Sequence, residues 1–462
     1  MASLTIRFPV RTLRAALAAL TALSLTLSPA RAQQVLRDAE TEALLAEASA
    51  PLIRAAGLDP RNVQVLLIHD DSVNAFVAGG QIVWIHTGLI AEADNINQVQ
   101  GVIAHELGHI EGGHVIRSAE GIKEATGISI LSLVLGAAMV AAGGAEAGMG
   151  VLAAGQQAAM GKYLAFSRTQ ESSADLAGAR YLHNAGISGE GSLQFFKKLQ
   201  NLEYRYRVRD DLQDGYSTTH PLSGDRIATL TSLYEQDPAW KKPVDPALEA
   251  RFERVKAKLI GYVSEPPVTL RKYPATDNSV PGFYARAYAW HKGAYPDQAL
   301  GATDALLKAV PGDPYFEELR GQILLESGRP TEAVVPLRLA VAGTHNNPLI
   351  SSMLGHALVA TEDPAHLDEA ERVLRTALGR DRDNPFAWYV LGTVYARKGD
   401  MPLAALASAE QASLSGNAGM AMRQAQTALV ALKPGSHDYL RAQDIAMAAR
   451  ADMDQDKGKK RK

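Results

Sequence analysis

Apolar residues follow two different periods in the first part of the chain. Residues 36–57 carry them at helical spacing, which predicts an amphipathic helix. Residues 62–70 (NVQVLLIHD) and 72–90 (SVNAFVAGGQIVWIHTGLI) are short apolar runs, which predict strands. Gly79-Gly80 interrupts the second run, and two glycines permit a turn or a bulge. A helix followed by a few short strands is therefore expected.

Helical spacing dominates the middle of the chain. A helix begins after Asp94 or Asn95, either of which can cap it, and helical segments continue to about residue 205 and again over 222–260. Residues 127–142 are apolar on every side, which predicts a buried helix of a hairpin. This run is short for a membrane span, which needs about 20 apolar residues. A loose contact with a membrane surface is the alternative.

The C-terminal part repeats a pair of helices. Units begin at Pro314, Pro348 and Pro385, roughly 34 to 37 residues apart, with 284–310 as an earlier unit and 418–447 as a weaker later one. This pattern resembles the tetratricopeptide repeat, whose stacked helix pairs bury a continuous core and leave a concave groove. The period makes a plain helical bundle the weaker alternative.

Composition and the N-terminus indicate the cellular location of the protein. Residues 1–32 have a basic start, the apolar run 15–27 and a small-x-small cleavage pattern before Gln33, as secretory signals do. A retained anchor helix is the alternative. The formal charge of -3 gives no indication of nucleic-acid binding. The chain has no cysteine, so any metal site must use His, Asp or Glu. We expect a soluble periplasmic protein.

The stretch VIAHELGHIEGGHV, residues 102–115, suggests a metal site. His105 and His109 are four residues apart, so they share one face of a helix and can bind one zinc ion. Glu106 lies close enough on the helix to approach a water on the metal. His114 would lie about 180° from His105 on a continuous helix, so a structural role is predicted for it.

One family of zinc enzymes places a third histidine ligand six residues after the second, but this chain has Val115 at that position. We therefore expect His114 to be structural, paired with Glu111, Asp175 or backbone.

A third ligand must then come from elsewhere. Glu171 and Asp175 are again four residues apart on one predicted helix, beside small residues that let it approach the histidine helix closely. Glu171 can complete a His₂Glu site, and Asp175 can fix the tautomer of a ligand histidine. A pair of solvated surface acids is the alternative.

HELGH at 105–109, ESSAD at 171–175 and THPLSGDRI at 219–227 together resemble the gluzincin metallopeptidases of the M48 type, which are related to the membrane protease of the CAAX-processing type. The resemblance implies one zinc ion per chain, with three ligands and a general base: His105, His109, Glu171 and Glu106. It places Asp175 in support of the ligands. Unlike the membrane branch of this family, the chain shows no clear spanning helix.

The resemblance also gives roles to two residues of the motif THPLSGDRI, at 219–227. It implies that His220 lies on a loop near the metal, where it can take the fourth position and hold the enzyme latent. A structural His-Pro turn is the alternative. Arg226 is expected to position that loop or to stabilise the oxyanion.

The expected fold is α+β and mostly helical, with a gluzincin domain and a small sheet followed by an α-solenoid. The predicted division is a signal peptide, a zinc metallopeptidase domain, a linker, a repeat domain and a basic tail, at 1–32, 33–262, 263–282, 283–447 and 448–462.

The implied function is an exported zinc endopeptidase that cleaves unfolded or misassembled envelope proteins, which add as a strand to a sheet edge near residues 73–85. Its repeats would dock substrates or outer-membrane assembly machinery. One alternative is a chaperone or scaffold with a largely latent site. Another is an integral membrane protease for lipidated peptides, which requires 127–142 to span the bilayer.

Overall fold

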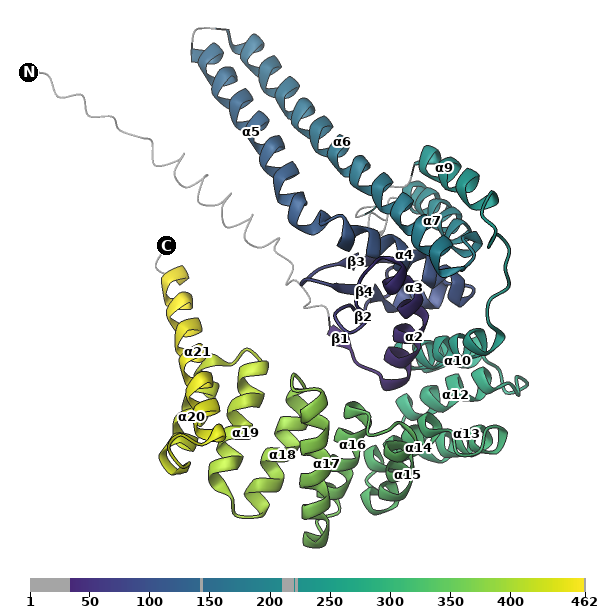
Figure 1. Cartoon of the computed structure of the whole chain (residues 1–462), viewed down its shortest axis with the longest axis vertical. Helices are drawn as coiled ribbons and strands as arrows, with labels where there is room; N and C mark the ends of the chain where they lie inside the picture. The colour runs from purple at the N-terminus through teal and green to yellow at the C-terminus, as the bar shows by residue number, and fades with distance from the viewer. Residues whose placement is uncertain (1–33, 142–143, 210–219, 221–222, 461–462) are drawn as a thin grey trace, which may run out of the picture.

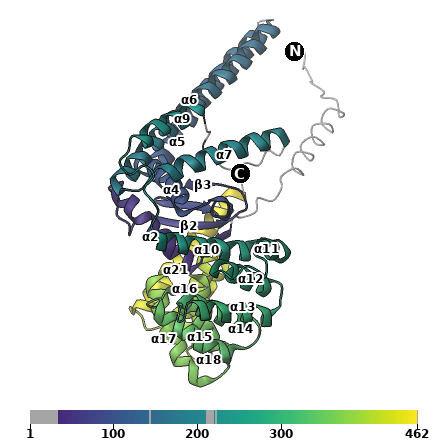
Figure 2. The ribbon, with the colours of Figure 1, turned by 90° about the vertical axis from the view of Figure 1, so that its right-hand side faces the viewer.

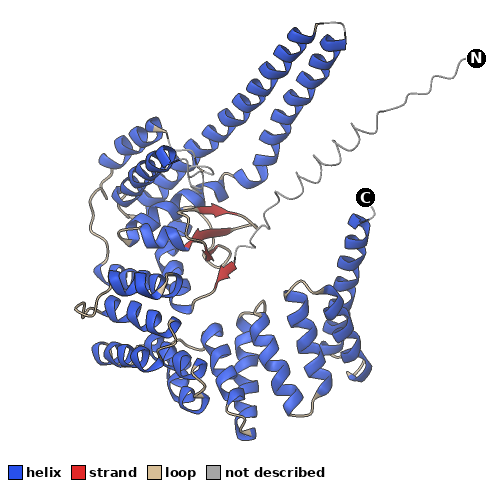
Figure 3. Ribbon diagram, turned by 180° about the vertical axis from the view of Figure 1, so that it is seen from behind, coloured by secondary structure: helices blue, strands red, loops and turns tan. Residues whose placement is uncertain are grey.

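The computed structural model describes residues 34–141, 144–209, 220 and 223–460 (Figure 1). The predicted signal peptide lies outside these residues. Helices make up most of the described chain, and the described residues also form one small sheet, so the α+β prediction is confirmed (Figure 3). The sheet and its helices form the upper body in Figure 1, and the paired helices of the C-terminal part form an arc beneath it.

The sheet has four strands in the order β1-β2-β4-β3. The strands are β1 (Gln34–Leu36), β2 (Gln64–His69), β3 (Ala75–Val77) and β4 (Ile82–His86). β2 and β4 are parallel, whereas β1–β2 and β3–β4 are antiparallel. Gly79 and Gly80 have φ of 70° and 100° between β3 and β4, so the predicted turn is confirmed. β3 is an edge strand, and its outer side has no strand partner among the described residues.

Two long helices pack on this sheet. The first, α2 (Ala39–Ala55), begins three residues later than its apolar pattern predicts, because Asp38 caps it and the preceding residues pair as β1. The short α3 (Thr87–Glu92) leads to α4 (Ile96–Glu111), which Asn95 caps by accepting the N–H of Gln98. Every residue of α4 from Ile96 to His109 is buried, because α2, α6 and α7 also contact it.

The helix α4 does not continue through His114, and the prediction of one continuous helix there was wrong. Gly112 ends α4, and Gly113 has φ of 61°, a left-handed conformation that glycine adopts without strain. A new helix, α5 (His114–Ala141), starts directly after this break. The break changes where the His114 side chain points.

A long hairpin leaves the body of the protein. α5 packs antiparallel against α6 (Ala145–Ala185), and the two helices project outward (Figures 1 and 2). The hairpin was predicted, but its predicted burial was wrong, because most side chains of residues 127–140 are exposed. Among the described residues, one helix, His114–Val140, is long and apolar enough to cross a membrane, judged by length and composition.

Three further helices close the first body: α7 (Glu190–Arg209), α9 (Gly224–Glu235) and α10 (Pro246–Val263). Phe195 and Phe196 of α7 and Phe252 of α10 are almost fully buried in a core shared with α2, α4 and the sheet. This core fixes α4 from several sides, so the side chains that α4 presents have a rigid support.

The repeats begin where their prolines predict. Each helix pair starts with a proline or small residue in its first turn, where the missing N–H of proline costs nothing. The pairs are α12/α13 (Val280–Lys292, Pro296–Ala309), α14/α15 (Pro314–Glu326, Pro330–Gly343), α16/α17 (Pro348–Ala360, Leu367–Arg380), α18/α19 (Pro385–Arg397, Met401–Leu414) and α20/α21 (Ala418–Ala431, His437–Lys460). A single 3-10 turn at Pro364–His366 accommodates the longer unit.

The predicted linker and tail contain more helix than their composition indicates. Within 263–282 the chain forms α11 (Pro266–Lys272), and α12 begins at Val280. Pro266, Pro267 and Pro281 stand in the first turns of these helices, and Pro274 lies between them. The last helix, α21, extends through most of the basic tail.

A buried ionic cluster joins α2 and α10 to the first repeats. Glu40 accepts hydrogen bonds from the Tyr284 hydroxyl at 2.6 Å and from Arg254 Nε at 2.5 Å. The Arg254 guanidinium also binds Asp313 at 2.8 Å, and Lys258 Nζ lies 3.4 Å from Glu40. We call Glu40, Arg254, Lys258, Tyr284 and Asp313 the ionic cluster. It ties the start of the described chain to two helices of the repeat domain.

Beside the ionic cluster, Glu318 of α14 is buried, and one of its oxygens has no hydrogen-bond partner in the described part of the chain. It lines a cavity of about 170 Å³ together with Lys258. Burial raises the pKa of Glu318 to about 8, although the charge of Lys258 opposes this. The folded protein therefore keeps a proton here that the unfolded chain, with an ordinary pKa near 4.3, releases.

This difference predicts how stability depends on pH. Between about pH 4.5 and 8 the contribution of Glu318 to the free energy of unfolding falls as pH rises, by at most about 1.4 kcal/mol per unit. Glu318→Gln cannot titrate, so its stability relative to wild type should rise from pH 5 to pH 8 in urea unfolding. Glu362→Gln, on an exposed turn of the repeats, should show no such trend. A constant difference between Glu318→Gln and wild type would contradict the prediction.

Candidate metal centre

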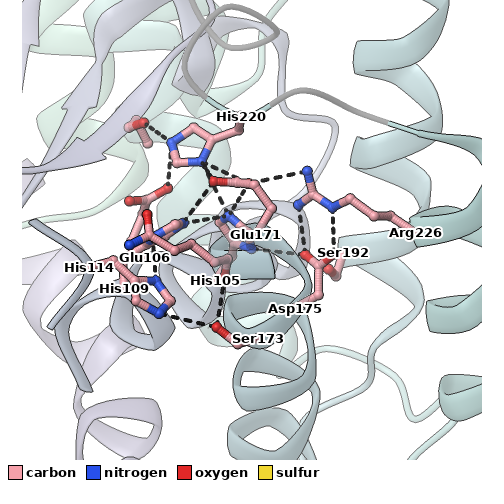
Figure 4. A network of polar contacts seen from close by, with 12 residues as sticks. His105, Glu106, His109, His114, Glu171, Ser173, Asp175, Ser192, His220 and Arg226 are labelled. Atoms are coloured by element: carbon pink, nitrogen blue, oxygen red, sulfur yellow. Dashed lines mark hydrogen bonds and ion pairs between the residues drawn. The ribbon is translucent and has the colours of Figure 1, made fainter. Parts of the chain in front are cut away.

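Three elements bring four potential ligands together. α4 supplies His105 and His109, α6 supplies Glu171, and His220 comes from the segment before α9 (Figure 4). All four side chains are buried, and one ligand atom from each lies within 4.8 Å of the others. The structure thus brings together all three predicted zinc ligands and the predicted fourth position.

The separations between these atoms suit a tetrahedral metal. Nε2 of His105 lies 3.1 Å from Nε2 of His109, and each lies 3.4 Å from a Glu171 oxygen. Nδ1 of His220 lies 3.4 Å from Nε2 of His105 and 3.2 Å from Glu171. With bonds of about 2.0–2.1 Å, tetrahedral ligands stand about 3.3 Å apart. The four residues therefore fit one zinc-sized ion.

Small residues make this approach of α4 and α6 possible. A side chain at Gly108 would meet the backbone of Ala174 at 2.7 Å, and one at Gly178 would meet the backbone of Ala104 at 3.1 Å. The small residues of the ESSAD helix were expected to permit close packing, whereas the need for Gly108 was missed. The glycine within HELGH indicated it.

The outer nitrogen of each α4 histidine has a partner. His105 Nδ1 lies 2.9 Å from Asp175 Oδ1. Asp175 in turn accepts two hydrogen bonds from Arg226, at 2.6 and 2.9 Å, and a third guanidinium nitrogen of Arg226 lies 3.1 Å from Glu171. Such contacts orient the ring and leave Nε2 free for a metal. They favour a positioning role for Arg226 over a role at the oxyanion.

His114 supports His109 instead of lying on the far side of the helix. Its Nδ1 lies 2.9 Å from His109 Nδ1, and its Nε2 lies 3.1 Å from the Ser173 hydroxyl. The partners predicted for His114 were wrong. Glu111 instead accepts hydrogen bonds from Arg180 and from a tyrosine hydroxyl. The consecutive glycines before His114 were the signal that the helix breaks there.

Two of the ligands have the ionisation state that a metal needs, whereas His105 must give up a proton to bind one. Burial lowers the pKa of His105, but hydrogen bonds with Asp175 and Glu171 outweigh it and raise this pKa to about 10. Burial, together with the charges of His105 and His220, holds the pKa of His109 far below its usual value, so this ring is neutral. Burial opposes ionisation of Glu171, but hydrogen bonds with His105 and His220 dominate and hold its pKa far below the usual range. A neutral imidazole and a carboxylate are the forms that bind zinc.

Glu106 is the buried acid that the ligands do not use. It is fully buried, and neither of its side-chain oxygens has a hydrogen-bond partner among the described residues. His220 Nε2 lies 3.5 Å from one of these oxygens, beyond a good hydrogen bond. Burial raises the pKa of Glu106 above its usual value. A desolvated carboxylate beside a ligand set is suited to accept a proton from a water molecule.

His220 also contacts the edge of the sheet. Its Nε2 lies 3.2 Å from the carbonyl oxygen of Ala75 in β3. One imidazole therefore reaches the ligand cluster with one nitrogen and the edge strand with the other (Figure 4). The contact with Ala75 was not anticipated, because sequence spacing cannot relate residues so far apart.

Comparison with known proteins agrees with this geometry. Residues 38–234 match the model of peptidase family M48. The chain is 25% identical to the beta-barrel assembly-enhancing protease of Yersinia pestis over 382 residues, which cover 81% of this chain and 76% of that protein. It is 31% identical over 181 residues to the metalloprotease LoiP of Escherichia coli (strain K12), covering 38% of this chain and 64% of that one. The crystal structure of YrrB, a TPR protein, aligns with 38% of this chain and 92% of its own at a TM-score of 0.32 and 19% identity.

Proposed function

We propose that the chain is an exported, zinc-dependent endopeptidase of the cell envelope, on the premise that residues 38–234 match the model of peptidase family M48. The observation that carries the proposal is the tetrahedral spacing of His105, His109 and Glu171 beside the buried Glu106, whose oxygens accept no hydrogen bond within the described part of the chain. A zinc ion held there would polarise a peptide carbonyl and activate water. Glu106 takes the proton of the attacking water and delivers it to the leaving amine.

The proposed substrates are unfolded or misassembled envelope proteins in the periplasm. In the part of the chain that the structure describes, β3 pairs with β4 on one side only, and its backbone lies next to the ligand cluster through Ala75. An extended segment can add to such an edge with main-chain hydrogen bonds, which a folded protein cannot offer. The similarity to a beta-barrel assembly-enhancing protease supports this class of substrate. The repeats would dock substrates or the outer-membrane assembly machinery.

We propose that His220 keeps the enzyme latent. It lies where a fourth ligand would, and it occupies the Ala75 carbonyl that an added substrate strand would need. Substrate entry must therefore displace this one side chain from both positions. The same observation favours a second candidate function, a scaffold for envelope assembly whose peptidase is mostly shut.

His220→Ala should raise casein cleavage several-fold, because it frees the fourth position and the strand edge together. Zinc content, measured on the same samples, should stay near one per chain, since three ligands remain. His183→Ala, an exposed histidine on α6, is the matched control and should leave both values unchanged. Loss of zinc in His220→Ala would show that His220 is a required ligand, and zinc without cleavage in any sample would favour the scaffold.

A further inference from the structure

We propose that the outer half of the α5–α6 hairpin, residues 125–141 and 144–161 of the described chain, inserts into a phospholipid bilayer and holds the metal centre close to the membrane surface. This inference goes beyond the proposed function, since peptide hydrolysis in solution does not require it. We call this segment the hairpin tip.

Charged residues stop abruptly where the hairpin tip begins. Lys162 of α6 and Glu124 of α5 lie 3.2 Å apart across the hairpin and mark one level. Beyond them, Glu146 at the turn is the one ionisable residue in 125–161. Gln156 and Gln157 are polar but uncharged. A soluble helix pair of this length would carry charges on its outer faces.

Apolar side chains cover every side of α5 that α6 does not. Five large apolar residues of α5 are each at least half exposed: Ile130, Leu131, Leu133, Val134 and Leu135. At 100° of rotation per residue around the helix axis, these five span an arc of about 200°. Ser132, which faces α6, lies outside this arc. A protein groove would cover one stripe of such a helix, whereas lipid surrounds it. The arrangement therefore favours lipid over a protein partner.

The contact between the two helices resembles packing in membranes. A side chain at Gly155 would overlap Ser132, and one at Gly136 would meet the backbone oxygen of Gly148 at 2.9 Å, so the backbones approach closely through small residues. The Ser132 hydroxyl donates to the Ser129 carbonyl at 2.9 Å, so this polar group is satisfied within its own helix. The hairpin tip needs no soluble core to stay paired.

The dimensions suit insertion from one side. Residues 125–141 of α5 extend about 25 Å, against a hydrocarbon thickness of about 30 Å, so the hairpin tip passes the midplane and returns without crossing. Tyr163 is partly exposed next to Lys162, at the level where charges resume. Aromatic and basic side chains favour the membrane–water interface.

Insertion would fix the height of the active site. α6 runs without a break from Ala145 to Ala185, so it carries both the hairpin tip and Glu171. Along the helix axis, Glu171 lies about 14 Å beyond Lys162. The candidate ligands would then stand just above the lipid headgroups, where the emerging segments of membrane-bound substrates are found.

Flotation with vesicles tests the proposal on the full mature chain. Wild type should float with vesicles of phosphatidylethanolamine and phosphatidylglycerol, and equally with pure phosphatidylcholine, because insertion is apolar. Leu131→Glu/Leu135→Glu should lower the partition coefficient by at least about tenfold. Val335→Glu/Leu339→Glu places the same charges, at the same spacing, on exposed apolar positions of α15 and should float like wild type. Casein cleavage in solution should be unchanged in both variants.

A second measurement uses the absence of cysteine from the chain. An environment-sensitive fluorophore on Val134→Cys should shift to shorter wavelength when phosphatidylcholine vesicles are added, whereas the same label on Val430→Cys in the repeats should not. Binding only to anionic vesicles, equal flotation of both double variants, or no shift at position 134 would overturn the proposal. So would a wild-type dimer that Leu131→Glu/Leu135→Glu converts to a monomer and that does not float, since a second copy would then cover the hairpin tip. Loss of casein cleavage in every sample would instead contradict the proposed function.

Discussion

Glu106→Gln is expected to abolish peptide hydrolysis and to leave the metal in place. Within the described residues, the side chain is fully buried beside the ligand cluster, neither of its oxygens has a hydrogen-bond partner, and it meets the cluster only through His220 Nε2, 3.5 Å away. Glutamine has nearly the same shape but cannot accept a proton. The rate of casein cleavage should therefore fall by about 10² to 10⁴-fold, the usual contribution of a general base.

The measurement compares initial rates of casein cleavage with zinc content for wild type, Glu106→Gln and Glu111→Gln. Glu111 belongs to the same helix but accepts hydrogen bonds from Arg180 and Tyr181 away from the ligands, so its variant should remain active. If Glu106→Gln cleaves at the wild-type rate, another group moves the proton. If it loses zinc, Glu106 supports the ligands instead.

Glu40→Ala should destabilise the protein by about 3 kcal/mol or more. The carboxylate is buried, and its removal leaves the Tyr284 hydroxyl without an acceptor and the Arg254 Nε without its partner. Removing one member of a buried ion pair typically costs 3–5 kcal/mol. The lower end of this range is expected here, because Arg254 keeps Asp313 as a partner.

The matched control lies on the same two helices. Glu47 of α2 pairs with Arg251 of α10, but both side chains are about half exposed, so Glu47→Ala should cost less than about 1 kcal/mol. Urea unfolding of zinc-loaded protein gives both values. Equal, small losses for the two variants would show that the ionic cluster adds nothing to the attachment of the repeats.

Much of this molecule could be predicted from its sequence, since the decisive patterns are local. The spacing of His105 and His109, the Asn95 cap and the prolines that begin the repeat units are each set within one helix. The acidic pair Glu171 and Asp175 on α6 needed one further step, the inference that small residues allow two helices to meet. These are short-range features that helical geometry fixes directly.

Other features depend on contacts that spacing does not encode. His114 meets His109 only because Gly113 turns the chain in a left-handed conformation. His220 was assigned through resemblance, and its contact with Ala75 arises from tertiary packing. The burial predicted for the hairpin failed because apolarity does not say whether protein or another apolar medium covers a helix.

The attachment of α2 to the repeats has a consequence for the order of events during synthesis. Ala39 belongs to the hydrophobic core of the repeat domain. Glu40 accepts a hydrogen bond from Tyr284, and its other partner, Arg254, also binds Asp313, so these contacts require residues that are far away in the sequence. At 5–20 residues per second, their synthesis follows that of Glu40 by on the order of 15–50 seconds. Throughout this interval the helix that packs against α4 has an unfinished end. The protease would therefore reach its final form only after the module that we propose selects its substrates has been made.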